Sequence, residues 1–173
     1  MSIDIGSAAP GFDLPDTNGD TWGPVGGAAT VIVFTCNHCP YALAWHDRLL
    51  RVASDYASRG VRMLFVNAND AERYPRDSPE AMAARVQADG PWPGPYLHDE
   101  TQDVARAYGA TVTPEVFVLD EAGKLRYRGA PDADHGDASL DAVWLREALD
   151  AVLGGNPPVA AVTQAVGCTI KWL

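Results

Sequence analysis

The residues of this chain best suited to chemistry are Cys36 and Cys39, which are separated by two residues in the segment TCNHCPY. Side chains at this spacing in the first turn of a helix come close enough to form a disulfide. The only further cysteine is Cys168, near the far end of the chain, and three cysteines are too few for a secreted disulfide framework. The pair therefore predicts redox or metal chemistry rather than a structural staple.

The position expected for Cys36 favours its ionised form. This cysteine follows an apolar run and precedes a helix, so its sulfur would lie against unpaired backbone N–H groups at the positive end of the helix dipole. We therefore expect the pKa of Cys36 to fall below the free value of about 8.5, which makes Cys36 the attacking thiolate and Cys39 the resolving thiol. His38, when protonated, would stabilise the thiolate further. Pro40 restricts the backbone where the helix begins.

Strands are expected on both sides of this corner. The run Ala29 to Phe34 is apolar throughout, which predicts a buried central strand, and residues 61–66 predict a second one. A turn signal at residues 18–20 predicts a β-hairpin within Ala9 to Gly27. The strand at 115–119 should be joined through DEAGK to LRYRG in another hairpin.

Helices should alternate with these strands. They are expected from the CNHC segment to about Ser58, from Pro79 with Ser78 as its cap, over Asp103 to Tyr108, and over Leu140 to Leu153. The first of them has an approximate apolar face formed by Leu43, Leu49, Leu50 and Val52. The segment PWPGPYLHDE is expected to be mostly loop. The order of a β-hairpin, then βαβα, then ββα predicts an α/β fold with a central mixed sheet, helices on both faces and a right-handed first crossover.

A strand–CxxC–helix unit followed later by Thr113-Pro114 and a β-hairpin resembles the thioredoxin superfamily. The opening APGFDLPDTNG is similar to that of its peroxiredoxin-like branch, the alkyl hydroperoxide reductase/thiol-specific antioxidant or redoxin group. The combination of FTCNHCPY with GCTIKW near the C-terminus is similar to a peroxiredoxin-like subgroup of that branch. This resemblance, over roughly residues 7–173, implies a thioredoxin-like oxidoreductase. It also implies a cis peptide bond at Thr113-Pro114, beside the dithiol, that holds substrate backbone by β-like hydrogen bonds.

The chain departs from the peroxiredoxin pattern at two positions. Typical peroxiredoxins carry a threonine three residues before the reactive cysteine and a proline four residues before that threonine. Val33 and Ala29 occupy those positions here, and Thr35 directly precedes Cys36. These differences disfavour peroxidase activity.

The chain also lacks an acid that typical thioredoxins bury six residues before the first cysteine, where it accepts a proton from the resolving thiol. Thr30 occupies that position. The candidates that remain for the proton relay of Cys39 are His38, His46 and Glu115.

Zinc binding is an alternative interpretation of the cysteine pair. A zinc site usually needs four ligands, and one CxxC motif supplies two of them. Cys168 with His38 or His46 could complete the set, but the chain has no second closely spaced pair, so we predict neither a metal nor a cofactor. Cys168 itself could be an auxiliary resolving thiol, a partner for mixed disulfides or a packed small hydrophobe. Packing is favoured, since its neighbours Ile170 and Trp172 fit a docked tail.

The composition limits the classes of partner. Residues 1–173 suit one thioredoxin-like domain, with residues 154–173 as a docked C-terminal tail, and 47% hydrophobic residues can fill a core. A formal net charge of −10 disfavours nucleic acids and anionic membrane surfaces as partners. The first residues show no signal-peptide pattern and no apolar run long enough for a membrane span, so a cytoplasmic location is expected.

The leading functional hypothesis is thiol–disulfide exchange, in which Cys36 attacks a disulfide of a protein or small-molecule substrate and Cys39 resolves the mixed disulfide. An external thiol reductant would then regenerate the pair. The first alternative is an antioxidant thiol peroxidase in which Cys36 becomes a sulfenic acid that condenses with Cys39 or Cys168. The second alternative is a non-enzymatic thioredoxin-fold module that binds a partner or carries a metal.

Overall fold

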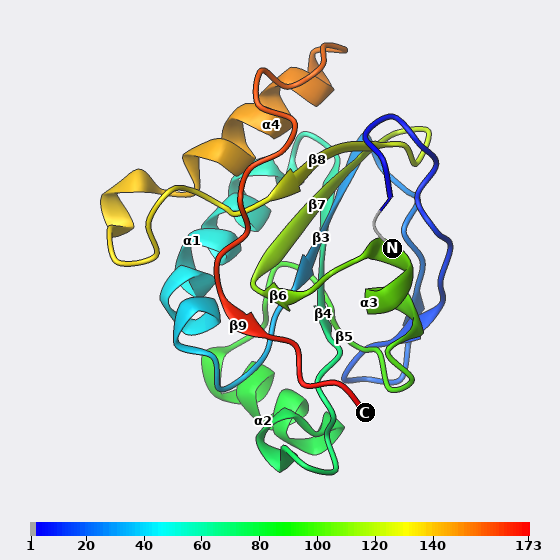
Figure 1. Cartoon of the computed structure of the whole chain (residues 1–173), viewed down its shortest axis with the longest axis vertical. Coiled ribbons are helices and arrows are strands. Elements are labelled where there is room, and N and C mark those ends of the chain that lie inside the picture. The colour runs from blue at the N-terminus through cyan, green and yellow to red at the C-terminus, as the bar shows by residue number, and fades with distance from the viewer. Residues whose placement is uncertain (1–2) are drawn as a thin grey trace.

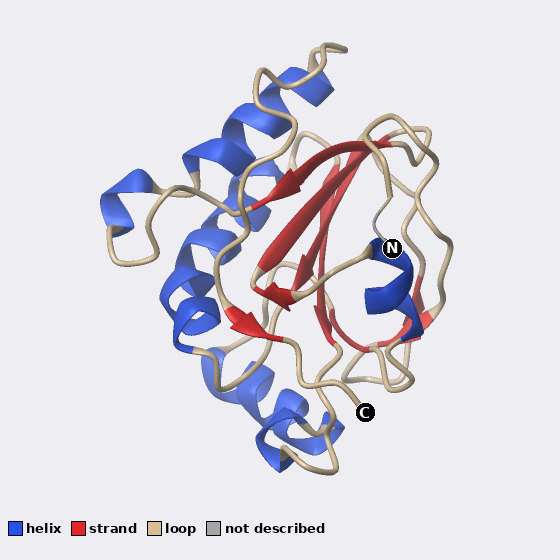
Figure 2. Ribbon diagram, viewed as in Figure 1, coloured by secondary structure: helices blue, strands red, loops and turns tan. Residues whose placement is uncertain are grey.

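The fold is described by a computed structural model of the chain, which covers residues 3–173. Its centre is a mixed sheet with the strand order β5-β4-β3-β7-β8 (Figure 1, Figure 2). These strands are β3 (Ala29–Phe34), β4 (Val61–Asn67), β5 (Tyr96–His98), β7 (Glu115–Asp120) and β8 (Leu125–Gly129). β3 runs parallel to β4 and antiparallel to β7, and every one of its residues is buried. The expected α/β, thioredoxin-like fold with a central mixed sheet is confirmed.

Helices and a small hairpin cover the two faces of this sheet (Figure 1). The helices are α1 (Pro40–Ala57), α2 (Pro79–Asp89), α3 (Asp103–Tyr108) and α4 (Val143–Leu153). α1 and α4 pack on one face, where Trp45 and Leu149 belong to the same apolar cluster. α3 packs on the other face around Phe34 and Tyr108, together with the predicted N-terminal hairpin. The strands of that hairpin are β1 (Leu14–Pro15) and β2 (Thr21–Trp22).

Two expectations about the helices need correction. In α1, Leu49 and Val52 are buried as expected, but Leu43 is 45% exposed, and Trp45 belongs to the buried face. The last helix begins at Val143 rather than at Leu140. A separate 3-10 turn over Ala138–Leu140 precedes it, and the next two residues have left-handed φ angles of 49° and 56°, which interrupt a continuous helix.

The start of α2 agrees with the sequence prediction, whereas the segment after α2 does not. Ser78 caps α2 as expected, because its hydroxyl accepts a hydrogen bond of 3.1 Å from the backbone N–H of Ala81. The segment expected to be mostly loop contains β5, whose residues pair in parallel with the last residues of β4. A strand this short is hard to recognise from its own pattern and exists because β4 offers a free edge.

After α4 the chain turns back and runs across the molecule past the end of the sheet (Figure 1). Its strand β9 (Cys168–Thr169) pairs antiparallel with β6 (Val112–Thr113), just before Pro114. Ile170 is 2% exposed and fixes the tail in the apolar cluster beneath α3. Among residues 3–173, none of the helices combines the length and the apolar character that a membrane crossing requires.

Candidate active site

The two cysteines lie together at the corner between β3 and α1. Cys39 is the N-cap of α1, in an extended conformation, and Pro40 occupies the first helical position. Both side chains are buried, Cys36 with 1% and Cys39 with 0% of its surface exposed. They form a small cluster with Ala42, against which Cys168 packs from the tail. All three cysteines are free thiols, so the structure shows the reduced form of the pair.

Thr113 contacts both sulfur atoms of the pair. Its hydroxyl lies 3.4 Å from Cys36 Sγ, and its carbonyl oxygen accepts a hydrogen bond of 3.3 Å from the Cys39 thiol. The Thr113-Pro114 peptide bond is cis, as the family resemblance implied. The end of β6 therefore holds the dithiol in place through one side-chain and one backbone oxygen.

The expectation that Cys36 carries the lowered pKa is wrong for the reduced pair. The two thiols lie in one buried cluster, and their interaction lowers the pKa of Cys39 while it raises that of Cys36. Burial and the nearby charge of Asp77 also raise the pKa of Cys36. The sequence prediction failed because the largest influence on each thiol is the other thiol; a backbone hydrogen bond with Ala42 is a smaller cause of the lowered pKa of Cys39.

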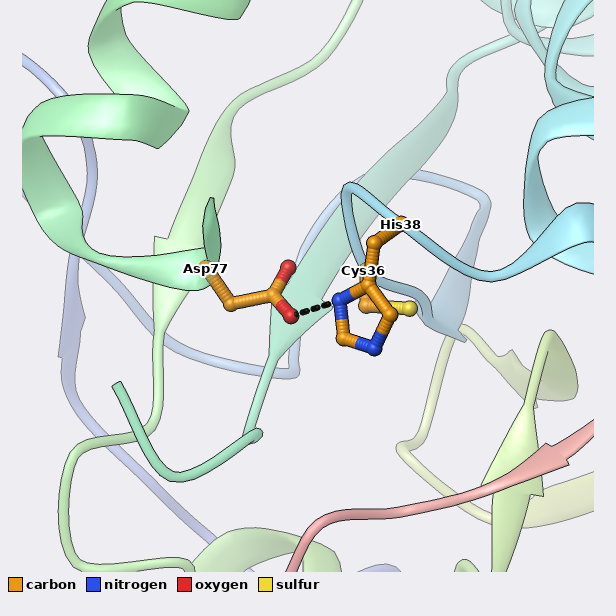
Figure 3. A group of neighbouring side chains, drawn as sticks. All are labelled: Cys36, His38 and Asp77. Carbon is orange, nitrogen blue, oxygen red and sulfur yellow. Dashed lines mark ion pairs between the residues drawn. The ribbon is translucent and has the colours of Figure 1, made fainter. Parts of the chain in front are cut away.

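An acid that the sequence analysis missed lies beside Cys36. Asp77 is fully buried, and one of its oxygens lies 2.5 Å from Nδ1 of His38 (Figure 3). Its carboxylate also accepts hydrogen bonds from the backbone N–H of Asn37 (2.6 Å) and from the side-chain amides of Asn67 (2.9 Å) and Asn69 (3.1 Å). Three donors thus hold the carboxylate in place and, together with the close contact of His38, offset the cost of burying its charge.

His38, which was expected to act on the thiolate, is held in a defined position. Its ring stacks on Tyr74 with an interplanar angle of 8°, and it forms an ion pair with Asp77 when it is protonated. A nitrogen of His38, an oxygen of Asp77 and Cys36 Sγ all lie within 4.8 Å of one another. The backbone of His38 also hydrogen-bonds to Cys36, which lowers the pKa of that thiol in opposition to burial.

The other two candidates for the proton relay are engaged elsewhere. His46 lies on α1 with its ring 4.6 Å from that of Trp92 and its Nε2 3.4 Å from a carboxylate oxygen of Asp89. Burial lowers the pKa of His46. Glu115 pairs with Arg128 at 3.1 Å and accepts a hydrogen bond from the backbone of Thr111. The structure therefore brings His38, and neither of these two residues, to the cysteines.

Cys36, His38 and Asp77 also form a set of potential metal ligands within the described part of the chain. The structure does not favour this use. One oxygen of Asp77 already faces donors from Asn37 and Asn67, and the other faces His38 and Asn69. A cation would have to displace these donors, and the set would still lack the fourth ligand of a typical zinc site.

The sequence contained a signal for Asp77 and its amide partners. Asn67 ends β4, and Asn69 follows it, at the same edge of the sheet where β3 leads into the CxxC corner. Polar side chains directly after a buried parallel strand often belong to a functional site, because the carboxyl ends of neighbouring strands lie together. From the sequence alone, this signal does not connect the segment to the cysteines, because the two are far apart in the chain.

Comparison with known proteins gives matches over most of the chain. The sequence pattern of the AhpC/TSA family matches residues 5–128. An uncharacterized conserved protein from Geobacillus kaustophilus is 40% identical with a TM-score of 0.92, covering 98% of this chain and 93% of that one. A hypothetical protein from Sinorhizobium meliloti 1021 is 36% identical with a TM-score of 0.91, covering 100% and 97%.

A more distant match is a candidate thioredoxin from Neisseria meningitidis, with 25% identity and a TM-score of 0.62. The aligned region covers 82% of this chain and 92% of that protein. A comparison with curated protein sequences gives no significant match.

Proposed function

The chain belongs to the AhpC/TSA family, and we propose that it catalyses thiol–disulfide exchange through Cys36 and Cys39. Family membership and the thioredoxin-like fold make it an oxidoreductase with a thiol redox function. The observation that carries the finer proposal is the pair of buried thiols clustered at the β3–α1 corner, both held by Thr113. Two sulfurs in such contact can close a disulfide without movement of the fold.

Exchange begins with ionisation of Cys36. Cys39 donates to the carbonyl of Thr113 as a thiol, so the attacking thiolate forms when Cys36 loses its proton, and the hydroxyl of Thr113 can donate to it. This thiolate attacks one sulfur of a substrate disulfide, and the other substrate sulfur leaves as a thiolate. Cys39 then gives up its proton and attacks Cys36, which closes the Cys36–Cys39 disulfide and releases the second substrate thiol. Two electrons pass to the substrate, and an external thiol reductant restores the pair.

The proposed proton acceptor for the resolving step is His38 with Asp77. The buried carboxylate of Asp77 holds the imidazole of His38 in place and would stabilise an imidazolium formed during this step. The pair lies next to Cys36, the sulfur that is attacked during resolution. It thus supplies an acid–base group where typical thioredoxins use a buried acid at the position of Thr30.

Thr113-Pro114 is the proposed binding element for the substrate. The edge of β6 can pair with an extended strand, as it does with β9 of the same chain, and a substrate peptide would take the place of β9 on this edge. The hydroxyl of Thr113 donates to a Cys36 thiolate, whose pKa its hydrogen bond lowers. A protein disulfide presented on an extended segment fits this arrangement, and a small disulfide could use the same edge.

Reduction of insulin disulfides and of glutathione disulfide tests the proposal. The wild-type protein should reduce both, and denatured samples should show two fewer free thiols after oxidation. Cys36→Ser should abolish reduction of both substrates. Cys39→Ser should instead stop at a mixed disulfide with glutathione, visible as a mass increase of about one glutathione at Cys36. Full activity of Cys36→Ser would show that another group attacks the substrate.

A second candidate function is a thiol peroxidase, which the match to the AhpC/TSA pattern over residues 5–128 favours. Here the Cys36 thiolate would attack one oxygen of hydrogen peroxide, form a sulfenic acid and release hydroxide. Cys39 would then displace water and form the same disulfide. Val33 and Ala29 argue against this reaction, because they replace the threonine and proline of typical peroxiredoxins. Stopped-flow mixing with hydrogen peroxide decides the question, since a rate no higher than that of free cysteine excludes a peroxidase.

A further inference from the structure

The dithiol is closed off from solvent in the reduced structure. Cys36 is 1% exposed and Cys39 is 0% exposed, so in this conformation neither sulfur is open to an external thiol, and a substrate disulfide reaches Cys36 only when the tail moves from β6. Cys168 is the one cysteine of the chain with a partly exposed side chain, and it packs on the same cluster. A redox enzyme must exchange electrons with a second thiol partner after each turnover. The accessible sulfur at this site is therefore the one on the tail.

The tail lies where a substrate strand would lie. Cys168 is the pairing partner of Thr113, and Thr169 is the partner of Val112, in an antiparallel arrangement on the edge of β6. Gly167 lies so close to this edge that a Cβ atom built on it would be 2.0 Å from the carbonyl oxygen of Thr113. Only glycine permits this approach.

Both ends of this strand are tied to the fold. Downstream, the backbone N–H of Lys171 donates to the side chain of Asn69 at 2.9 Å, and its carbonyl accepts from the side chain of Gln102 at 2.8 Å. Upstream, the backbone N–H of Thr163 donates to the carbonyl of Arg128 at 3.0 Å. The tail therefore holds Cys168 against the cluster that contains Cys36 and Cys39.

We infer that Cys168 is a third redox thiol, which attacks Cys39 of the Cys36–Cys39 disulfide and carries the oxidised bond outward as a Cys39–Cys168 disulfide. This inference rests on the proposed function, since it starts from the disulfide that exchange leaves behind. The step breaks one S–S bond and forms another, so it needs no added oxidant. Cys168 is oxidised, Cys36 is reduced to a thiolate, and the proton that Cys168 loses is taken up at Cys36. An external thiol then reduces the disulfide at the partly exposed Cys168.

The electrostatics make this relay depend on the redox state. In the reduced structure, burial, a hydrogen bond to Cys39 and the charge of Cys39 raise the pKa of Cys168 to about 11, while the charge of Lys171 lowers it. When Cys39 enters a disulfide, it can no longer ionise and no longer raises the pKa of Cys168. The charge of Lys171 still lowers that pKa. Cys168 is thus a poor nucleophile in the reduced enzyme and becomes a better one when the pair is oxidised.

Peptide mapping of the oxidised full-length protein tests the relay. Wild-type protein is oxidised with diamide, quenched in acid, alkylated and digested, and the disulfide-linked peptides are identified by mass spectrometry. We expect both Cys36–Cys39 and Cys39–Cys168 links, and in Cys36→Ser a Cys39–Cys168 link alone. If Cys36–Cys39 forms but no Cys39–Cys168 link is found in either protein, the relay is wrong and the proposed function stands. If neither link forms in the wild-type protein, both proposals fail.

Kinetics provide a second test. Cys168→Ser should form the Cys36–Cys39 disulfide in the first turnover at the wild-type rate, but its reduction by glutathione should be slower by about tenfold or more. Thr169→Ser, a conservative change at the next residue of the same strand, is the matched control and should keep the wild-type rate. An unchanged rate of reduction in Cys168→Ser would overturn the relay.

A third test addresses the strand that positions Cys168. Gly167→Ala should lift the tail from β6, raise the rate at which iodoacetamide alkylates the dithiol and lower the yield of the Cys39–Cys168 link. Gly11→Ala is the control, because a Cβ at Gly11 meets no atom within 4 Å and should change neither quantity. If Gly167→Ala leaves both quantities at wild-type values, the tail does not hold Cys168 in place, which contradicts the inference.

Discussion

Replacement of Thr113 by valine separates the chemistry of the site from its shape. Valine has nearly the volume and branching of threonine, so β6 and its pairing with the tail should persist. The backbone carbonyl that accepts from Cys39 is also retained. What is lost is the hydroxyl that lies 3.4 Å from Cys36 Sγ, and with it a hydrogen bond that lowers the pKa of both thiols.

The size of the effect follows from the bond that is removed. A hydrogen bond to a charged group contributes about 1.5–3 kcal/mol, and each 1.4 kcal/mol is about a factor of ten in an equilibrium constant. The thiolate on the pair should therefore be about ten to a hundred times less favoured in Thr113→Val. The neutral folded state loses only one ordinary hydrogen bond, about 1 kcal/mol. The variant should thus remain folded while its thiol chemistry shifts.

The assay is the pH dependence of alkylation by iodoacetamide, read by mass spectrometry on the reduced protein. Burial of the sulfurs lowers the alkylation rate by the same factor at every pH and does not move the midpoint of the rate–pH curve. The midpoint therefore reports ionisation alone. We expect the midpoint of Thr113→Val to lie about one to two pH units above that of the wild type. Thr111→Val is the control, because the side chain of Thr111 is exposed and lies two residues before Thr113. This variant should keep the wild-type midpoint. A midpoint unchanged in Thr113→Val would refute a role of the hydroxyl in stabilising the thiolate.

Two further predictions concern the elements that support the site. Arg48→Met should lower the free energy of unfolding in urea by about 3–5 kcal/mol, because it leaves the fully buried carboxylate of Asp132 without its ion-pair partner. Arg51→Met breaks an exposed ion pair and should lower that free energy by at most about 1 kcal/mol. Burial lowers the pKa of His46, so the unfolded chain binds a proton near pH 6.5 that the folded chain excludes. Stability should therefore fall between about pH 7 and pH 5, and the fall should be smaller in His46→Gln; an equal fall in both proteins would contradict this assignment.

The parts of the fold with a strong local pattern could be predicted from the sequence. The uniformly apolar run of β3 could only be a central strand, and Ser78 before Pro79 marked the start of α2. The start of the last helix could not be read in this way. Its apolar spacing extends back to Leu140, but the left-handed backbone at Asp141 and Ala142 breaks the helix, and neither residue type announces such a conformation.

The chemistry of the site was predicted only in part, because much of it depends on contacts between distant segments. The CxxC spacing identified Cys36 and Cys39, but which of them carries the charge depends on Asp77, which lies on another element. The position of Cys168 depends on pairing between β9 and β6, two-residue strands that have no pattern of their own. Gly167 was a usable signal, since a glycine beside a cysteine suggests a close approach of two backbones.

Asp77 and Cys168 act on different cysteines of the pair. The interaction with Cys39 and burial raise the pKa of Cys36, and the charge of Asp77 raises it further, which disfavours a second negative charge at that sulfur. The pKa of Cys39 is lowered instead, first by its interaction with Cys36 and, to a smaller extent, by that with Cys168. Because Cys168 packs on this cluster from the tail, Cys39 is the sulfur of the pair at which the relay is expected to pass to the tail.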